Sequence, residues 1–460
     1  MKLLNVVDTS WLFVESRATP MHIGTLSIFA LPEGAHDEFV QQTVALLRDT
    51  RTFASPWNLK LNDGALVTSI PRWVEDDDID MDYHFRHSAL PKPGGERELG
   101  VLVSRLHSHQ LDLNRPPWEV HLIEGLAGNR MALYTKMHHS IVDGGSGVRL
   151  LSRMYSTDPD ARQMLPPWSI PPSREPRKAA ARVLSPRALF EMARSGGKSG
   201  VALLRALRRW VESTRDEGSN LKVPFTARRS ALNSRIKGSA RRFATQQYDL
   251  GEIKALARAA DCTLNDIVLY LCGTALRRFL KESDRLTDAP LTAGIPVDVR
   301  PADDEGVGNA LSFMIASLGT DIDDPLVRLA AIKASTREGK ELLQSLPRSA
   351  LTPYMMMIMA PYMVQMMTGI GASTRPVFNI IISNVAGPRR PLYFNGARLA
   401  ALYPVSLLTH GAALNITCLS YADTLNFGFT GCRDSLPHMQ RLAVYTGEAL
   451  AELAAVLRPA

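Results

Sequence analysis

The feature of this sequence that most restricts its fold is a pair of adjacent histidines between a strand pattern and a helix pattern. Apolar and polar residues alternate over residues 130–137, which predicts a strand, and apolar residues recur at helical spacing over residues 148–155. Between them the chain reads His138-His139-Ser140-Ile141-Val142-Asp143-Gly144-Gly145. Successive residues of a strand point to opposite faces, so the two histidines cannot serve one atom equally. We expect one histidine to work and the other to pack.

Three explanations of the His pair are open. The simplest is a buried structural pair beside a turn aspartate. A metal site needs at least three convergent ligands, and no His-Glu-x-x-His or clustered cysteines supply them. General-base catalysis would use imidazole, which titrates near neutral pH and takes a proton readily from an alcohol. The spacing His139-x-x-x-Asp143-Gly144 resembles the active-site motif of the CoA-dependent acyltransferase superfamily, and this favours the third explanation.

Length and charge give the general setting. The 460 residues suffice for two domains, and 45% hydrophobic with 22% charged residues is typical of a globular protein. The four cysteines show neither metal nor disulfide spacing, which suits a reducing cytoplasm, and no secretory signal is visible. Between Arg174 and Arg242 there are 18 Lys and Arg against five Asp and Glu, so this segment carries +13 and the rest −6. Such a segment favours an anionic lipid surface over nucleic acid, because it has no aromatic-interleaved basic motif of the kind that binds RNA or DNA.

The sequence divides into an N-terminal domain over residues 1–158, a Pro-rich and basic linker over 159–238, and a C-terminal domain over 239–460. Helices are expected at residues 36–50, 96–111, 267–282 and 436–457. Strands are expected at residues 25–29, 120–126, 130–137, 243–250, 290–300, 310–318, 377–385, 414–421 and 425–430. In the linker, residues 188–212 predict a helix interrupted at Gly196-Gly197.

That linker helix has an apolar side and a basic side. Its apolar residues are Leu203, Leu204, Leu207, Trp210 and Val211, and its basic residues are Arg205, Arg208 and Arg209. Two explanations stand side by side. The helix lies on a membrane surface, or it crosses between the domains, packed on the protein with its arginines in water.

Residues 349–374 carry no charge, and seven of the 17 methionines lie between Met355 and Met367. A membrane span needs about 20 apolar residues. Pro353 and Pro361 interrupt this stretch, so we expect no clean span. Methionine fills irregular apolar space, so the stretch suits either a long-chain lipid site or ordinary core.

Several motifs together resemble the bacterial wax ester synthase/acyl-CoA:diacylglycerol acyltransferase family over nearly the whole chain outside about 160–230. The family markers are Thr19-Pro20-Met21-His22-Ile23-Gly24, Pro116-Pro117-Trp118, His138 to Gly144, Leu264-Asn265-Asp266-Ile267-Val268 and Ile382-Ser383-Asn384-Val385-Ala386-Gly387-Pro388. Two departures, Pro117 where the family usually has Leu and Ala386 where it usually has Pro, do not touch the His motif.

The resemblance implies a mixed α/β (α+β) fold of two chloramphenicol-acetyltransferase-like domains with a tunnel between them. It implies acyl transfer from acyl-CoA to a fatty alcohol or diacylglycerol, with His139 as the general base, no acyl-enzyme, and no cofactor, since acyl-CoA is a substrate. The expected location is cytoplasmic, at the periphery of the inner membrane or of lipid bodies, without nucleic acid as a partner.

The resemblance also assigns the other site residues. His138 and Asp143 complete the catalytic motif, and Arg300 is expected to pair with Asp143. The candidates for substrate or oxyanion contacts are Gly144, Asn265, Asp266, Ser383 and Asn384. Thr263 and Asp266 also fit a helix capping box, which alone would explain why Asp266 is present. Two alternatives remain: a non-catalytic lipid-body surface protein of the same fold, and a condensation-type acyltransferase.

Overall fold

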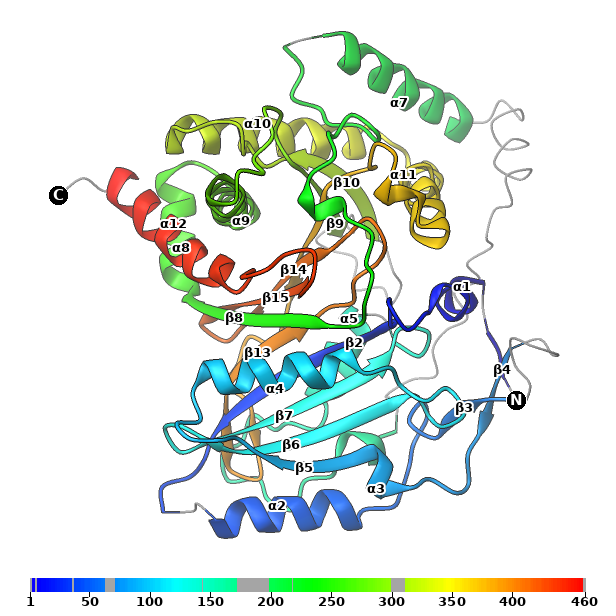
Figure 1. Ribbon diagram of the computed structural model, residues 1–460, viewed down its shortest axis with the longest axis vertical. Helices are drawn as coiled ribbons and strands as arrows, with labels where there is room; N and C mark the ends of the chain where they lie inside the picture. The colour runs from blue at the N-terminus through cyan, green and yellow to red at the C-terminus, as the bar shows by residue number, and fades with distance from the viewer. Residues whose placement is uncertain are drawn as a thin grey trace.

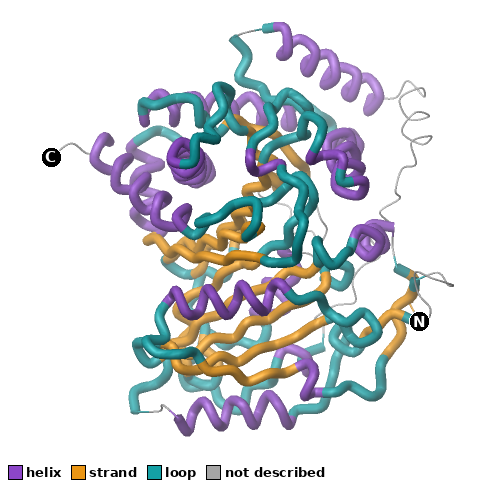
Figure 2. Tube along the Cα trace, in the orientation of Figure 1, coloured by secondary structure: helices purple, strands orange, loops and turns teal. Residues whose placement is uncertain are grey.

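The computed structural model describes residues 2–4, 6–34, 37–62, 71–142, 144–171, 198–216, 218–298 and 311–457. Two six-stranded sheets, one above the other in Figure 1, organise the molecule. A three-stranded sheet lies beside the N-terminus, in the order β1 (Lys2–Leu3), β4 (Arg72–Glu75) and β3 (Leu59–Leu61). The tube in Figure 2 shows the helices gathered on the outer faces and between the two sheets.

The N-terminal sheet is covered by a helix on each face. Its strands, in spatial order, are β12 (Tyr393–Phe394), β13 (Ala397–Val405), β2 (His22–Ala30), β7 (Arg130–His138), β6 (Trp118–Leu126) and β5 (Phe85–Ala89). On β7, Met131 and Leu133 pack with α2 (Asp37–Asp49), whereas Ala132 and Tyr134 pack with α4 (Glu96–Ser108). The alternation expected from the sequence is therefore confirmed, and both faces of this strand are buried.

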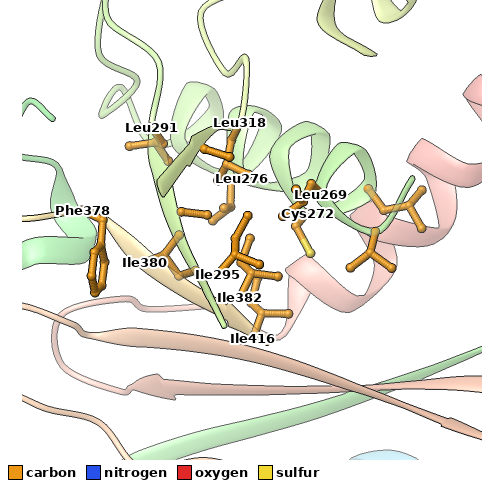
Figure 3. Packing of buried hydrophobic residues seen from close by; sticks show 14 of the residues in the cluster. Leu269, Cys272, Leu276, Leu291, Ile295, Leu318, Phe378, Ile380, Ile382 and Ile416 are labelled. Atoms are coloured by element: carbon orange, nitrogen blue, oxygen red, sulfur yellow. The ribbon is translucent and has the colours of Figure 1, made fainter. Parts of the chain in front are cut away.

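The C-terminal sheet has its helices mainly on the face turned away from the N-terminal half (Figure 1). Its strands, in order, are β10 (Leu311–Ser317), β9 (Thr292–Asp298), β11 (Ile380–Ala386), β14 (Leu414–Tyr421), β15 (Thr424–Cys432) and β8 (Arg241–Asp249). The covering helices include α8 (Leu250–Ala259), α9 (Leu264–Glu282), α10 (Pro325–Gln344) and α12 (Arg441–Leu457). Figure 3 shows side chains of α9, such as Leu269 and Leu276, against Ile295, Ile382 and Ile416 of the sheet.

The two sheets meet through β13, which comes from the C-terminal part of the sequence but pairs with β2. Apolar residues of β2, among them Ile28, pair with this strand, so β13 covers an edge that would otherwise be open. The boundary at residues 238 and 239 therefore separates the strands of the two large sheets except for β12 and β13. On the other side, Gly428 of β15 lies so close to β13 that a Cβ atom there would be 1.9 Å from the carbonyl oxygen of Pro404.

Helix α11 (Arg348–Thr368) runs through the uncharged stretch, and both Pro353 and Pro361 lie within it. The prolines therefore do not end the helix. In the part of the chain that the structure describes, no helix is long and apolar enough to cross a bilayer.

Candidate active site

The His pair stands where β7 ends, and two neighbouring segments hold its backbone. The N–H of His138 donates to the carbonyl of Pro117 at 3.0 Å, and the N–H of His139 donates to the carbonyl of Met21 at 2.8 Å. Trp118 anchors the first segment, because it is fully buried and its Nε1 donates to the carbonyl of Trp57 at 2.7 Å. Two of the sequence markers thus act as supports for the His motif.

The side chain of His138 is buried, and both of its ring nitrogens are engaged. Nε2 lies 2.7 Å from the carboxylate of Glu15. Nδ1 lies 2.6 Å from the hydroxyl of Ser140 and accepts the N–H of Ser140 at 3.2 Å. Since a backbone N–H can only donate, Nδ1 carries no proton, and the proton of a neutral ring sits on Nε2 and is donated to Glu15. His138 therefore packs, as the sequence led us to expect of one member of the pair.

The side chain of His139 is only half-buried and leaves the strand end beside helix α1 (Val6–Val14). Its ring centroid lies 4.3 Å from that of Trp11, with 34° between the ring planes. Helix α5 (Gly144–Ser152) follows the turn, so the expected helix is present but begins at Gly144, four residues before the apolar pattern of residues 148–155. Asp143 and Arg300 lie outside the described residues, so their pairing stays a prediction.

Helix α1 and the residue directly after it supply two contacts that the sequence analysis missed. Trp11 of α1 contacts His139, and Glu15, which follows the last residue of α1, contacts His138. The two residues stand four positions apart, a spacing that favours the same side of a helical turn. Leu12 is buried with Leu61 and Trp73 of the small sheet, which ties the helix to that sheet. The spacing of Trp11 and Glu15 was visible in the sequence, but nothing in it indicated that these side chains face His138 and His139, which are 123 and 128 positions further along the chain.

A buried ionic cluster lies directly behind the His motif. Lys136, with a fully buried side chain, lies 3.0 Å from Glu119 and donates to the carbonyls of Leu106 and His109 at the end of α4. Burial opposes ionisation of Glu119, but the hydrogen bond from His121 and the charge of Lys136 outweigh it and lower the pKa of Glu119 to about 2. Lys136 thereby joins α4 to β7 two residues before the His pair.

Two further buried histidines connect the same region to the C-terminal half. His22 donates to the carbonyl of His107 at 2.9 Å. His107 donates to the carbonyl of Ser406 at 3.0 Å and accepts from the hydroxyl of Tyr134 at 2.7 Å. Burial lowers the pKa of His107 to about 3 and that of His22 well below its ordinary value. Both rings are therefore neutral supports at physiological pH.

On α9, the position of the candidate Asp266 is explained by a helix cap. Thr263 caps the helix, and the carboxylate of Asp266 accepts from the N–H of Thr263 at 2.8 Å and from its hydroxyl at 2.6 Å. The hydroxyl of Thr336 on α10 donates to the other oxygen of Asp266 at 2.6 Å. The capping box is confirmed, and a substrate role for Asn265 or Asp266 stays a prediction.

The candidates on β11 differ in the face they occupy. Ile382 packs into the C-terminal core, and Asn384 shares its face by strand alternation. Val385 packs with the N-terminal cluster that contains Val142 of the His motif, and Ser383 shares that face. Ser383 is therefore on the side of β11 that is turned toward the N-terminal half.

Comparisons with known proteins now decide the family. The sequence profile described as wax ester synthase/diacylglycerol acyltransferase catalytic domain matches residues 4–268, and the profile of the WS/DGAT C-terminal domain matches residues 307–454. The chain belongs to the wax ester synthase/diacylglycerol acyltransferase family. The resemblance seen in the sequence is thus confirmed, and the protein is an acyltransferase.

Relatives of this family align over almost their whole length. A putative diacylglycerol O-acyltransferase of Mycobacterium tuberculosis is 45% identical, with 97% of this chain and 96% of the relative covered. An O-acyltransferase of Acinetobacter baylyi is 37% identical, with 98% and 96% covered.

Solved structures confirm the fold. The wax ester synthase/diacylglycerol acyltransferase of Marinobacter aquaeolei is 38% identical and superposes with a TM-score of 0.81, covering 99% of this chain and 100% of the other. The starter condensation domain of rhizomide synthetase gives a TM-score of 0.55 at 13% identity, covering 99% of this chain and 94% of the other. At that identity the likeness concerns the fold alone, which is the mixed α/β architecture of two related halves expected from the sequence.

Proposed function

We propose that this acyltransferase moves a long-chain acyl group from acyl-CoA to the hydroxyl of a fatty alcohol or a diacylglycerol, with His139 as the general base. The observation that carries the proposal is that the two histidines of the pair lie in different surroundings. Both ring nitrogens of His138 are already engaged, whereas His139 is half-exposed at the strand end. The names of the relatives support the two acceptor classes.

The chemistry needs one base and no covalent enzyme intermediate. The imidazole of His139 takes the hydroxyl proton of the acceptor, and the acceptor oxygen forms a bond to the thioester carbon. The carbon–sulfur bond then breaks, and His139 returns the proton to the sulfur of CoA. Burial raises the pKa of Cys262 to about 11 and raises those of Cys272 and Cys418, which disfavours a thiolate nucleophile and supports direct attack.

The developing oxyanion needs a hydrogen-bond donor. Strand alternation favours Ser383 over Asn384, because Ser383 shares the face of Val385, which packs with Val142 of the His motif. Asp143 is proposed to pair with Arg300 and to shape the turn that starts at Ser140, without touching the substrate. Gly144, Asn265 and Asp266 stay weaker candidates, and a tunnel between the halves would bring CoA and acceptor to His139 from opposite sides.

The proposal predicts unequal effects of the two histidines. His139→Ala should lower thiol release from palmitoyl-CoA with hexadecanol by ~10²–10⁴-fold in a folded protein, which is the usual contribution of a general base. His138→Ala should lower it less, since its ring has no free nitrogen for the substrate. Circular dichroism checks the fold of both variants, and a panel of alcohols and diacylglycerol identifies the acceptor. Full turnover in folded His139→Ala would refute the base, and a larger loss in His138→Ala would reverse the two roles. A wild-type protein without thiol release would favour the lipid-body surface protein.

A membrane or lipid-body surface is the proposed working place, with α7 (Lys198–Arg215) as the contact. The sequence suggested one apolar side, but the structure divides it. Leu203 and Trp210 pack on the protein, and the Trp210 ring lies 5.7 Å from that of Tyr354 on α11. Leu204 is 57% and Val211 49% exposed, so the apolar side is wider than the surface that covers it. The packed residues support a helix that lies on the protein, and the exposed Leu204 and Val211 beside basic residues support our proposal that α7 also contacts a lipid surface.

The membrane proposal has a direct test in charge reversal. Changing three of the four arginines of α7 to Glu should release the protein from anionic vesicles, because each cation near such a surface contributes about 1 kcal/mol. The arginines are Arg205, Arg208 and Arg209. Binding of the wild type should weaken with salt, and activity on detergent-dispersed alcohol should stay nearly intact. If vesicle binding is unchanged in this variant or does not depend on salt, the membrane contact lies elsewhere. The methionine-rich α11, where Val364 and Met367 are exposed, would then be the next candidate.

A further inference from the structure

Glu15 occupies a position that is costly for a carboxylate. Its side chain is only 5% exposed, and it directly follows the C-terminal end of α1, where the helix dipole disfavours negative charge. Burial of a charge is unfavourable unless partners compensate for it. Here the partners are the Nε2 proton of His138 at 2.7 Å and the amide of Gln110 at 3.4 Å. The nearby ammonium of Lys136 adds a further favourable charge, since Glu15 is among the groups that act to raise its pKa against desolvation.

The contact between Glu15 and His138 determines the hydrogen bonds of both ring nitrogens of His138. Because Nε2 of His138 donates to Glu15, Nδ1 stays free of a proton and accepts the N–H and the hydroxyl of Ser140. The other tautomer would set an N–H against the N–H of Ser140. The carboxylate thereby determines the tautomer of the ring, and the ring determines the path of the chain as it leaves β7 into the turn.

The same side of α1 also contacts the other histidine. Trp11 is four residues before Glu15, and its ring lies 4.3 Å from that of His139. The two histidines leave the strand end in different directions, so α1 lies across that end and touches both. Leu12, which is buried with Leu61 and Trp73 of the small sheet, holds this helix in place and so can keep the two contacts in fixed relation.

We propose that α1 together with Glu15, the residue directly after it, positions the His pair: Glu15 holds His138 in the Nε2–H tautomer and so fixes the turn, while Trp11 sets the ring orientation of His139. Neither residue takes part in proton or acyl transfer. This inference rests on the proposed role of His139 as the base. It gives Glu15 and Trp11 a function that acts on turnover and not on substrate affinity.

Two near-isosteric substitutions test the role of Glu15. Glu15→Gln keeps an oxygen that accepts the Nε2 proton but removes the charge, and it should retain kcat within about threefold. Glu15→Asp keeps the charge but withdraws the acceptor, and it should lower kcat by ~10–100-fold with KM for palmitoyl-CoA nearly unchanged, because small misplacements of a catalytic group cost that much. Glu15→Ala should match Glu15→Asp. The thermal midpoint of each variant checks that it is folded. If Glu15→Ala does not fold, Glu15→Gln and Glu15→Asp still test the inference.

The chain offers a matched control in Glu124, which lies 3.3 Å from His87 on the same sheet but away from the His motif. Glu124→Ala should leave kcat at the wild-type value. Trp11→Phe should retain most of kcat, and Trp11→Ala should lower it. The double variant Glu15→Ala/His138→Ala should be no worse than the poorer single variant, because partners in one interaction are non-additive.

A spectroscopic readout reports the tautomer itself. In protein labelled with ¹⁵N-histidine, the His138 resonances, assigned by their loss in His138→Ala, should show the neutral Nε2–H form in the wild type and in Glu15→Gln. Wild-type kcat in Glu15→Ala, equal losses in Glu15→Gln and Glu15→Asp, or additive losses in the double variant would overturn the inference. None of these outcomes bears on His139, whose role fails separately if His139→Ala retains turnover.

Discussion

The close approach of the two sheets predicts that Gly428→Ala damages both stability and activity. A Cβ at Gly428 would lie 1.9 Å from the carbonyl oxygen of Pro404, where an ordinary contact is at least 3.4 Å, so β15 and β13 must separate by about 1.5 Å. Pro404 pairs with Thr25 of β2, and Thr25 pairs with Thr135 of β7, three residues before His138. The displacement therefore reaches the strand that carries the His pair. Misplacement of about 1 Å costs ~10²-fold in rate, and overpacking costs about 1–3 kcal/mol.

The assay measures kcat by thiol release from palmitoyl-CoA together with the urea midpoint. Gly447→Ala on α12 is the matched control, because its Cβ would meet nothing closer than 3.5 Å and alanine is favoured in a helix by about 1 kcal/mol. We expect the control to keep full activity and gain slightly in stability. If Gly428→Ala had wild-type kcat and midpoint, the sheets would not meet as described, and the proposed coupling between them and the His motif would be refuted.

Three other predictions concern the supports of the site. His107 has a pKa of about 3 in the folded protein against 6.5 in the unfolded chain, so its contribution to stability is complete above pH 6.5. Below pH 6.5 the free energy of unfolding should fall by about 1.4 kcal/mol per pH unit. Urea midpoints between pH 8 and 5 should therefore fall less steeply in His107→Gln, and an unchanged slope would contradict this. Lys136→Met leaves Glu119 buried without its cation and should lower the free energy of unfolding in urea by about 3 kcal/mol. This is the low end of the range for a broken buried ion pair, because other partners of Glu119 remain. A loss below about 1 kcal/mol would mean that the pair is not desolvated. Asp143→Ala and Arg300→Ala should lower activity alike, and a double variant much worse than either would argue against their pairing.

Local patterns in the sequence were sufficient for several of the elements and for part of the site. Alternation predicted β7 and the face of each of its residues, and the spacing of Thr263 and Asp266 predicted the capping box of α9. The marker Pro116-Pro117-Trp118 could be identified in the sequence, and in the structure this segment lies beside His138 and is held by the buried Trp118. Each of these features depends on residues that are neighbours in the chain.

Features that depend on distant pairing could not be predicted. Nothing in residues 397–405 indicates that they join β2 and not the C-terminal sheet, because alternation describes a strand and not its partner. The helical pattern of α7 showed one apolar side, but only its neighbours determine that Leu203 is buried and Leu204 exposed. Likewise Glu15 is unremarkable as a residue at a helix end until the fold brings His138 within 2.7 Å.

The late arrival of β13 has a consequence for synthesis on the ribosome. Strand β2 is complete at residue 30, but its neighbour begins at residue 397. At translation rates of about 5–20 residues per second, the edge of β2 waits roughly 20–70 s for its partner. During that time a strand with apolar residues such as Leu26 and Ile28 offers open hydrogen-bonding groups to other nascent chains. The His motif, already made, thus stays on an unfinished sheet until most of the chain has emerged, so that catalytic competence and protection from aggregation arise at the same late moment.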